Sequence, residues 1–332
     1  MINLAIVGLG RWGKVLVESV QDVSREVRFG MAVTRDPEAA KLFCTPRGIV
    51  PVGSFSDALS NPKVDAIVLA SPHSHHAGQV VECAAARKPV FVEKPFALTS
   101  QSARSAIAAA RAAGIAVAVG FNRRWLPPIV ELKQIVMSGQ LGTILHIEAN
   151  FSGNSVGRYT AESWRVANGE SPAGGLAGSG IHHIDAIIHL VAPITEVFAV
   201  SVARIHNVQL DDTTIVTFRL ADGATASLLT MTATAPIYRL QIFGTKGRAQ
   251  VDGSAETRGT ETLEVVPVSG VRSVRNYPPL DVERAELEAF ADTVAGRKPY
   301  PVSVAEVLNG VAAFEAVSVS AAKRAVVTIS VE

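Results

Sequence analysis

The sequence lacks the compositional extremes that mark specialised classes of protein. Its 332 residues include two cysteines, Cys44 and Cys83, too few for a disulfide-stabilised scaffold, and this suits a reducing compartment. Neither sign of charge dominates, because 31 basic residues stand against 30 acidic ones, which argues against general nucleic-acid binding. With 48% hydrophobic and 18% charged residues, the composition is that of a globular chain rather than a disordered one.

Long apolar runs are also missing. The most apolar stretch, 103–120, is interrupted by Arg104, Arg111 and Gly114, and it falls short of the ~20 residues that a membrane span needs. The first ten residues have no basic segment ahead of an apolar one, so they do not read as a secretory signal. We therefore expect a cytoplasmic protein that acts without a membrane or a nucleic acid.

What is present is a regular alternation of elements over the first 120 residues. The length suits about two domains at roughly 150 residues each. The apolar runs are hydrophobic throughout rather than alternating, which is typical of parallel strands buried on both faces. Repeated strand–helix units predict a parallel sheet, and we assign 1–122 to an α/β Rossmann-type dinucleotide-binding domain. The predicted strands are 3–7, 29–34, 66–70, 90–93 and 115–119, and the predicted helices are 11–20, 37–43, 74–86 and 99–113.

The pattern changes after Gly120. Longer alternating runs joined by tight turns, such as 221–223 and 244–247, indicate antiparallel hairpins. We therefore assign 123–332 to an α+β domain with a large, mainly antiparallel open sheet. Its predicted strands are 143–151, 196–205, 213–220, 224–232, 238–243, 262–266 and 326–331, and its helices are 126–137, 284–295 and 303–323.

A glycine-rich loop follows the first predicted strand. Gly8-Leu9-Gly10-Arg11-Trp12-Gly13 fits G-x-G-x-x-G and leads directly into a predicted helix. In such loops the first glycine permits a tight turn and the second lets the backbone approach a pyrophosphate. The third lets the helix pack closely on the strand. The pattern alone is weak, and its strand–loop–helix setting is what predicts dinucleotide binding.

The end of the second predicted strand indicates which dinucleotide is bound. NAD-binding domains usually carry an acidic residue there, about 20 residues past the loop, and here that place holds Thr34 and Arg35. A guanidinium beside a hydroxyl suits a 2′-phosphate. Asp36 is the counter-argument, but Asp36-Pro37 is typical of a helix N-cap and first turn. We therefore favour NADP, with NAD as the alternative.

Charged residues also end the strand at 90–93. Glu93-Lys94-Pro95 stands at a carboxyl edge of the sheet, where ligands bind in open α/β folds. Lys94 is therefore a candidate to hydrogen-bond a substrate oxygen. The alternative is a solvated strand end with no role in chemistry.

Histidines cluster in two places. Ser71-Pro72-His73-Ser74-His75-His76 follows a strand, and His182, Asp185 and His189 share one face of a helix starting near Gly180. Three interpretations compete for the second cluster: a metal site, side chains satisfied locally at a helix start, and acid–base chemistry centred on His182. We favour acid–base chemistry and expect no metal.

Taken together, these motifs resemble those of the glucose-fructose oxidoreductase, inositol dehydrogenase and rhizopine-catabolism (Gfo/Idh/MocA) family of oxidoreductases. The similarity covers nearly the whole chain. Each motif is modest alone, but they occur in the family's order. They are the glycine loop, the 71–76 segment as [ST]-P-x-x-x-H, Glu93-Lys94-Pro95, Gly120-Phe121-Asn122-Arg123-Arg124 with Pro127, Trp164-Arg165, His182-His183-Ile184-Asp185 as H-x-x-D, and Phe243-Gly244-Thr245-Lys246-Gly247.

The resemblance implies hydride transfer between a nicotinamide and a secondary alcohol or ketone of a sugar, a cyclitol or a related small molecule. It implies that Lys94 hydrogen-bonds the reacting oxygen, that His182 accepts or donates the proton, and that Asp185 orients substrate hydroxyls or the histidine. The open sheet implies a homodimer or homotetramer. Cofactor contacts are expected from the loop 8–13, Thr34, Arg35, Ser71, Pro72, His73, His76, Glu93, Lys94, Asn122, Trp164 and Arg165, and substrate contacts from Lys94, Arg123, Tyr159, His182 and His183.

The chain departs from this family at one position. Many members carry D-x-G-x-H-x-x-D, and the residue at the place of the first Asp is Gly178. The missing carboxylate removes a polar anchor and a neighbour that would raise the pKa of the histidine. Two other functions therefore stay open: a non-catalytic dinucleotide sensor on the same fold, and a dehydrogenase of dihydrodiols or aldehyde hydrates.

Overall fold

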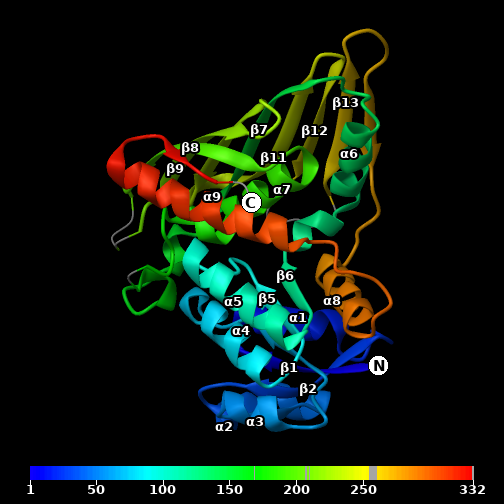
Figure 1. Ribbon diagram of the computed structural model, residues 1–332, viewed down its shortest axis with the longest axis vertical. Helices are drawn as coiled ribbons and strands as arrows, with labels where there is room; N and C mark the ends of the chain where they lie inside the picture. The colour runs from blue at the N-terminus through cyan, green and yellow to red at the C-terminus, as the bar shows by residue number, and fades with distance from the viewer. Residues whose placement is uncertain (168, 206–207, 209, 254–259, 331–332) are drawn as a thin grey trace. The chain divides into compact units, whose positions relative to one another are not determined.

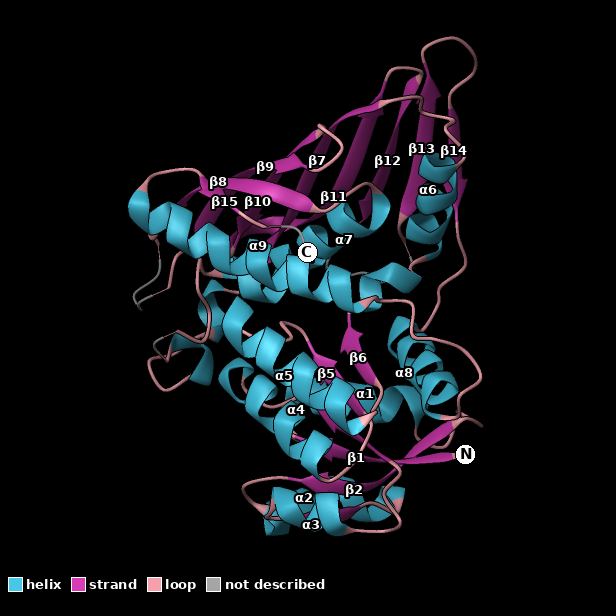
Figure 2. Cartoon of the chain, in the orientation of Figure 1, coloured by secondary structure: helices cyan, strands magenta, loops and turns pink. Residues whose placement is uncertain are grey.

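The computed structural model describes residues 1–332 except 168, 206–207, 209, 254–259 and 331–332 (Figures 1 and 2). The chain forms two compact units. The first comprises Met1–Asn122 with Asp281–Val304, and the second comprises Arg123–Leu280 with Ala305–Glu332. The first unit thus includes 281–304, a segment that the sequence analysis assigns to the second domain.

The first unit is built on a six-stranded parallel sheet in the order β3-β2-β1-β4-β5-β6. The order reverses between β1 and β4, which makes the carboxyl ends of these two strands the ligand-binding edge of a Rossmann fold. All side chains of β4 and β5 are buried, as expected between two helical layers. The strands are β1 (Ile2–Val7), β2 (Val27–Val33), β3 (Val50–Val52), β4 (Ala66–Leu69), β5 (Val90–Glu93) and β6 (Val117–Gly120).

Two helices of this unit, α2 and α5, begin at a side-chain cap. The Asp36 carboxylate accepts from the Ala39 amide at 2.9 Å, and the Thr99 hydroxyl accepts from the Ser102 amide at 3.2 Å. The sequence analysis missed β3 and α3, which are too short to show a clear period. The helices are α1 (Arg11–Val20), α2 (Pro37–Cys44), α3 (Phe55–Ser60), α4 (His76–Ala85), α5 (Ser100–Ala113) and α8 (Val282–Val294).

Helix α8 joins the first unit because it packs on the Rossmann core. The Phe290 ring lies 5.9 Å from that of Phe91 on β5, and Tyr300 donates from its hydroxyl to the Val119 carbonyl oxygen at 3.1 Å. These partners are distant in sequence, so no local pattern predicts the return of 281–304 to this unit.

The second unit is built on a nine-stranded mixed sheet in the order β14-β13-β12-β11-β7-β10-β9-β8-β15. Strands β7 and β10 run parallel, and the other neighbouring pairs are antiparallel. The predicted, mainly antiparallel sheet is confirmed, but β12 and β14 were not predicted. The strands are β7 (Ile144–Asn154), β8 (Ile194–Val202), β9 (Thr213–Leu220), β10 (Thr225–Met231), β11 (Ala233–Gly244), β12 (Gly247–Gly253), β13 (Thr262–Pro267), β14 (Ser273–Asn276) and β15 (Val327–Thr328).

One face of this sheet is covered by helices, among them α7 (Ile181–Leu190) and α9 (Val304–Lys323), and α6 (Pro127–Met137) lies beside β12 and β13 (Figure 1). Strand β9 alternates strictly between buried and accessible side chains, as a sheet with one covered face requires. Among the described residues, α9 alone is long and apolar enough to qualify as a membrane span by length and composition. Half of its apolar window is buried inside the structure, which is typical of a core helix.

Candidate active site

The glycine loop between β1 and α1 has the shape that a pyrophosphate requires. Gly8 has a φ of +96°, and a Cβ there would lie 2.6 Å from the Ala70 carbonyl oxygen. A Cβ at Gly13 would collide with the Gly8 carbonyl oxygen, whereas a Cβ at Gly10 would meet no atom within 4 Å. Gly8 and Gly13 are thus needed for close packing, whereas Gly10 leaves its backbone open at the start of α1. The residues present therefore fit a bound dinucleotide.

The loops that follow β4 and β5 are held together by His76. Its Nδ1 lies 2.8 Å from the Pro95 carbonyl oxygen and its Nε2 lies 3.0 Å from the Ser71 carbonyl oxygen. His76 has no exposed surface and His73 is 4% exposed. Both therefore shape this sheet edge from within. Lys94, next to Pro95, is half-buried at the same edge.

Glu93 is the buried acid of this edge. Its side chain is packed so closely against Gly120 of β6 that a Cβ at Gly120 would come within 3.0 Å of it. Burial raises the pKa of Glu93 to about 7, although the charge of Lys94 and the Trp12 indole oppose the rise. Glu93 is therefore poised to change its protonation state near neutral pH.

A pocket of about 410 Å³ in the first unit adjoins the glycine loop and the end of β2. Leu9 and Thr34, two of the expected cofactor contacts, line it together with Asp36, which the sequence analysis assigns to a helix cap. Arg35 is exposed and is not among its lining residues. Two cations that the sequence analysis missed line the pocket, and both stand over the ring of Phe43: Lys14 with its Nζ 5.3 Å from the ring centroid and Arg47 with its guanidinium carbon at 4.0 Å. The spacing of Lys14 and Arg47 in the sequence carries no signal for this grouping.

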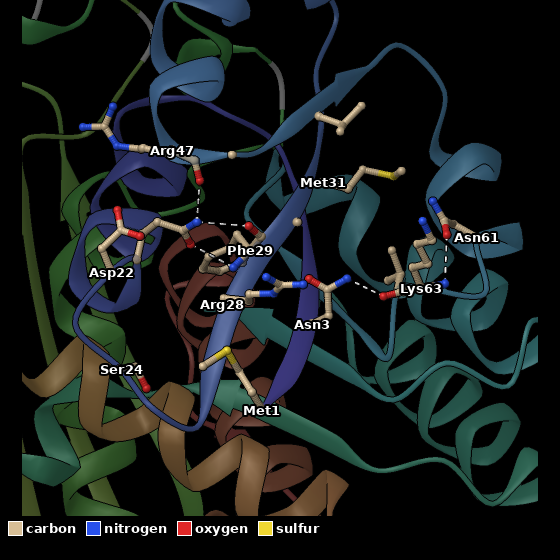
Figure 3. A pocket seen from close by; sticks show the side chains of 15 residues that line it. Met1, Asn3, Asp22, Ser24, Arg28, Phe29, Met31, Arg47, Asn61 and Lys63 are labelled. Atoms are coloured by element: carbon tan, nitrogen blue, oxygen red, sulfur yellow. Dashed lines mark hydrogen bonds between the residues drawn. The ribbon is translucent and has the colours of Figure 1, made fainter.

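A larger pocket of about 650 Å³ lies at the other ends of these strands. Asn3, Arg28 and Lys63 are among its lining residues, next to the amino ends of β1 and β2 and ahead of β4 (Figure 3). The glycine loop follows the carboxyl end of β1, so this pocket is not the dinucleotide site. The sequence analysis did not single it out.

In the second unit the helix that carries the H-x-x-D motif is preceded by a π-helical turn, Leu176–Gly180. Such turns are frequent at functional sites. A Cβ at Gly175 would lie 2.8 Å from the Thr232 side chain, and a Cβ at Gly180 would lie 2.8 Å from the Leu176 side chain. A Cβ at Gly178 would meet no atom within 4 Å. Gly178, the place of the missing carboxylate, is therefore open, whereas its neighbours are glycine because of packing.

The two histidines at the start of α7 lie in different surroundings. His182 is 7% exposed, and its ring lies 5.9 Å from that of Phe151. His183 has no exposed surface and stacks on Tyr238 at 4.9 Å and 27°. Burial lowers the pKa of His183 to about 3, so this residue stays neutral. The geometry therefore gives a substrate no surface of His183 to touch.

Arg123 lies over the same aromatic rings. Its guanidinium carbon is 5.5 Å from the Phe151 centroid and 5.3 Å from the Tyr238 centroid, and its Nη1 is 3.7 Å from Glu261 Oε1. Arg123 is 7% exposed. The charge of Arg123 is therefore engaged by partners within the second unit.

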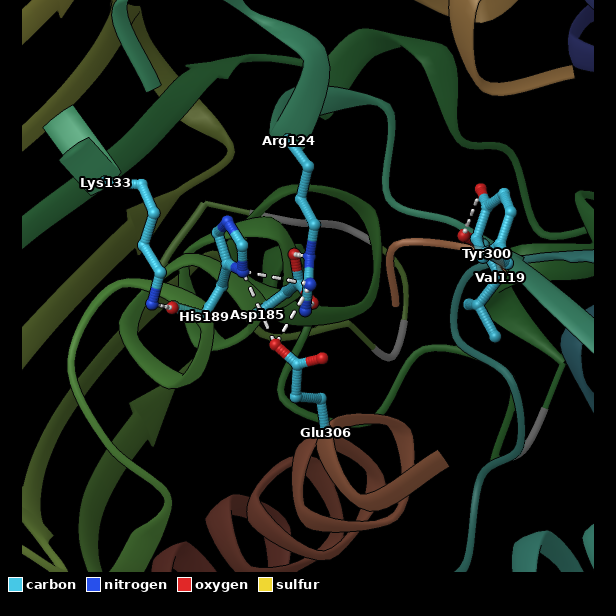
Figure 4. Close-up of polar contacts among 7 residues, drawn as sticks. All are labelled: Val119, Arg124, Lys133, Asp185, His189, Tyr300 and Glu306. Atoms are coloured by element: carbon cyan, nitrogen blue, oxygen red, sulfur yellow. Dashed lines mark hydrogen bonds and ion pairs between the residues drawn. The ribbon is translucent and has the colours of Figure 1, made fainter. Parts of the chain in front are cut away.

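Asp185 forms a buried ion cluster (Figure 4). Arg124 donates from Nε to Oδ2 at 2.9 Å and from Nη2 to Oδ1 at 2.7 Å, and its Nη1 lies 3.0 Å from both Glu306 Oε1 and His189 Nδ1. Lys133 donates to the His189 carbonyl oxygen. Both carboxylate oxygens of Asp185 are thus engaged by one guanidinium, a use that the spacing of H-x-x-D does not reveal.

The remaining predicted contacts lie in and around two short 3-10 turns, Val156–Arg158 and Trp164–Val166. Trp164 is 39% exposed, and the guanidinium carbon of Arg165 lies 4.4 Å from its ring centroid. Tyr159 directly follows the first turn. In the first unit, the Asn122 amide donates to Glu283 at 2.8 Å. No group of three or more histidine, cysteine or acidic side chains that could hold a metal ion occurs among the residues that the structure describes.

A Rossmann unit with an open glycine loop, joined to a second unit with a large mixed sheet, is the architecture of a dinucleotide-binding protein. Comparison with known proteins agrees. Residues 2–121 match the oxidoreductase family with an NAD-binding Rossmann fold, and residues 129–250 match the GFO/IDH/MocA C-terminal domain. The chain belongs to the Gfo/Idh/MocA family of oxidoreductases, as its motifs suggest.

Individual relatives show the same kinship. The uncharacterised oxidoreductase YrbE of Bacillus subtilis is 30% identical over 276 residues, which are 80% of this chain and 76% of that one. The myo-inositol 2-dehydrogenase of Thermotoga maritima is 25% identical, with 91% of each chain covered. Among solved structures, a putative NADPH-dependent oxidoreductase from Desulfitobacterium hafniense superposes with a TM-score of 0.90 at 21% identity, covering 98% of this chain and 97% of that one. The last similarity concerns the fold.

Proposed function

We propose that this protein oxidises a secondary alcohol, or reduces the matching ketone, on a sugar, a cyclitol or a related small molecule. The observation that carries the proposal is the sheet edge of the first unit. There a half-buried lysine, Lys94, follows β5 at the same edge as the open glycine loop that follows β1. Cyclitol chemistry is supported by the relative named as a myo-inositol 2-dehydrogenase.

Each proposed catalytic side chain has one task. A bound nicotinamide supplies the hydride acceptor or donor at its C4 position. Lys94 donates a hydrogen bond to the reacting substrate oxygen, and His182 accepts the hydroxyl proton during oxidation or returns it during reduction. His182 suits this task because histidine is the side chain that enzymes use most often to transfer a proton to or from a reacting group. Asp185 contributes to the position of α7, since its oxygens are held by Arg124.

The test is a substrate screen followed by substitution. NADP⁺ reduction is followed by absorbance with cyclitols, aldoses and trans-dihydrodiols, and the best substrate is then used for kinetics of Lys94→Met and His182→Gln. We expect kcat to fall by about 100-fold or more in both variants. His75→Gln is the matched control, because His75 is an exposed histidine of the first unit.

Two outcomes would reject this proposal. Wild-type kcat in both variants would remove the assigned roles. Tight dinucleotide binding without turnover on any member of the panel would instead favour a sensor on the same fold.

We also propose that NADP is the preferred dinucleotide, with Lys14 as the main contact of its 2′-phosphate and Arg35 as a secondary one. Asp36, the one carboxylate of the 410 Å³ pocket, accepts from the Ala39 amide and caps α2, whereas Lys14 faces this pocket beside Phe43. A phosphate needs cations rather than a ribose-binding carboxylate.

Dissociation constants for NADPH and NADH decide between the two dinucleotides. We expect Lys14→Met to weaken NADPH by about tenfold while leaving NADH within about twofold. Arg35→Asp should also lower the NADPH preference. Lys41→Met is the control, because Lys41 is an exposed lysine whose charge is paired with Glu38 on α2. An NADH preference in the wild-type protein would reject NADP.

We propose, in addition, a homo-oligomer that is assembled through the uncovered face of the nine-stranded sheet. Val200 and Ile215 are directly paired on β8 and β9 and are 50% and 51% exposed. Phe198 and Val202 on the same strand face are 39% and 38% exposed, which makes a contiguous apolar surface. A cytoplasmic location is proposed because both cysteines are free buried thiols.

A further inference from the structure

Arg123 and Arg124 are consecutive residues of the turn Asn122–Trp125, at the start of the second unit. We propose that these two arginines are positioning residues that together fix His182: Arg124 holds the helix that carries it, and Arg123 holds the ring that its imidazole packs on. The inference rests on the proposed function, in which His182 exchanges the substrate proton.

Arg124 restrains helix α7 through Asp185. Asp185 follows His182 by three residues, so the two side chains project from the same face of the helix. The two hydrogen bonds from Arg124 occupy both carboxylate oxygens, at 2.9 and 2.7 Å. A planar, two-point contact of this kind resists rotation of the helix about its axis, which a single hydrogen bond does not.

A second turn of α7 is tied to the same guanidinium. The Nη1 atom of Arg124 lies 3.0 Å from His189 Nδ1 and 3.0 Å from Glu306 Oε1, near the start of α9. Lys133 of α6 donates to the carbonyl oxygen of His189 (Figure 4). The orientation of α7 is therefore set from α6, from α9 and from the turn 122–125.

Arg123 acts on the other side of the same helix start. Its guanidinium stands over Phe151 and Tyr238, and the Phe151 ring is the surface on which the His182 imidazole packs, at 5.9 Å between centroids. His183 packs against the same two rings, 5.8 Å from Phe151 and 4.9 Å from Tyr238, and these rings also contact each other at 5.2 Å. The cation and the neutral histidine leave the Phe151 ring little freedom to move.

The partners that these groups already hold argue against direct contact with a substrate. Arg123, Arg124 and Asp185 are 7%, 6% and 5% exposed, and each forms an ion pair inside the second unit. Because a misplacement of about 1 Å at a reacting group costs about 100-fold in rate, a shell of this kind affects turnover without touching the substrate.

The experiment compares Asp185→Asn, Arg124→Lys and Phe151→Leu with a matched control. The control is Asp252→Asn, which breaks the exposed pair of Arg239 and Asp252 on β11 and β12, 3.1 Å apart. The first readout needs no substrate. In protein labelled with ¹⁵N-histidine, the ring signals of His182 are identified by their loss in His182→Gln. We expect these signals to shift in the three variants and to stay unchanged in the control.

The second readout is steady-state kinetics on the substrate found by the screen. We expect kcat to fall by about tenfold to 100-fold in the three variants while KM stays within about threefold. Arg123→Lys is included because Arg123 was predicted to contact substrate. If it raises KM at unchanged kcat, Arg123 is a substrate ligand and the inference is wrong for that residue.

A second variant distinguishes a loss of folding from a loss of function. If Asp185→Asn does not fold, the double variant Arg124→Met with Asp185→Leu removes both charges together and carries the same measurements. Folded variants with wild-type His182 signals and wild-type kcat would overturn the inference. If the wild-type protein turns over no substrate, the proposed function fails, while the ring signals still decide whether the arginines position His182.

Discussion

Arg124 and Asp185 face each other as a buried two-point ion pair, with Nε 2.9 Å from Oδ2 and Nη2 2.7 Å from Oδ1. Burial raises the pKa of Asp185, and the charge and hydrogen bonds of Arg124 oppose that rise. The pair joins the turn 122–125 to the helix that carries His182. Asp185 is thus better described as part of the support of this helix than as a group that exchanges protons.

Breaking this pair should be costly. Asp185→Ala leaves the Arg124 charge buried beside fewer partners, so we expect the free energy of unfolding to fall by about 3 to 5 kcal/mol. Asp252→Ala, in the exposed pair with Arg239, should cost about 1 kcal/mol or less. Urea denaturation followed by circular dichroism measures both. Similar losses in the two variants would contradict the role given to burial.

Glu93 should make the stability of the first unit depend on pH. Its pKa is about 7 in the folded protein against 4.5 for an unperturbed glutamate, so between these values the native state binds more protons than the unfolded state. The stability that this acid contributes is therefore complete below pH 4.5 and lost as the pH rises through 7.

Glu93→Gln should remove this loss, which is on the order of 3 kcal/mol. Urea denaturation between pH 4.5 and 7.5, without dinucleotide, tests the expectation. The exposed Glu82→Gln is the control. Parallel stability curves for the wild type and Glu93→Gln would refute the assigned pKa.

The glycines of the dinucleotide loop should separate folding from binding. Gly13→Ala places a Cβ against the Gly8 carbonyl oxygen and should destabilise the first unit, whereas Gly10→Ala should fold normally and bind NADPH at least tenfold more weakly. Gly78→Ala in α4 meets no atom within 4 Å and should raise stability by up to about 1 kcal/mol. Thermal melting and NADPH titration distinguish the three. Normal NADPH affinity in Gly10→Ala would be inconsistent with a pyrophosphate at this loop.

Gly178→Asp restores the carboxylate that many relatives carry. The structure offers room for a side chain at this position, so the melting temperature should stay close to that of the wild type, whereas Gly180→Ala should lower it through the close contact with Leu176. A new negative charge one turn before His182 favours the imidazolium form and should move the acidic limb of the kcat/KM profile to higher pH. An unchanged pH profile with normal folding would place position 178 outside the reaction site.

The uncovered sheet face should control assembly. Val200→Lys with Ile215→Lys puts two like charges at directly paired positions of β8 and β9. We expect light scattering to show a dimer or tetramer for the wild type and a smaller species for the double variant. The control is Val81→Lys, which adds a charge at an exposed apolar residue of α4, away from this sheet. A monomeric wild-type protein would refute the proposed interface.

The sequence was most informative where structure is local. Strands β4 and β5, helix α1 and the glycine loop are found at or near their predicted residues, because a buried parallel strand, an amphipathic helix and a tight turn each leave a short-range pattern. Strand β3 was not predicted, because its residues Val50-Pro51-Val52 are too few to show a hydrophobic period.

The sequence did not predict which distant residues meet at the candidate site. Lys14 and Arg47 meet over Phe43 only after α1 and the segment behind α2 fold against each other. Arg123 and Arg124 look equivalent in the sequence, yet Arg123 lies over two aromatic rings beside Glu261, whereas Arg124 holds both oxygens of Asp185. Such assignments depend on partners far along the chain, and no spacing rule encodes them.

The chain by itself therefore determined the class of fold, the dinucleotide loop and the family, because these follow from short-range patterns and from motif order. Only the tertiary structure decided that 281–304 joins the Rossmann unit, that His183 is buried against two rings and held neutral, and that Asp185 is bound by Arg124. The physical reason is that burial and ion pairing depend on which distant side chains meet, whereas helices, strands and turns depend mainly on their neighbours in the chain.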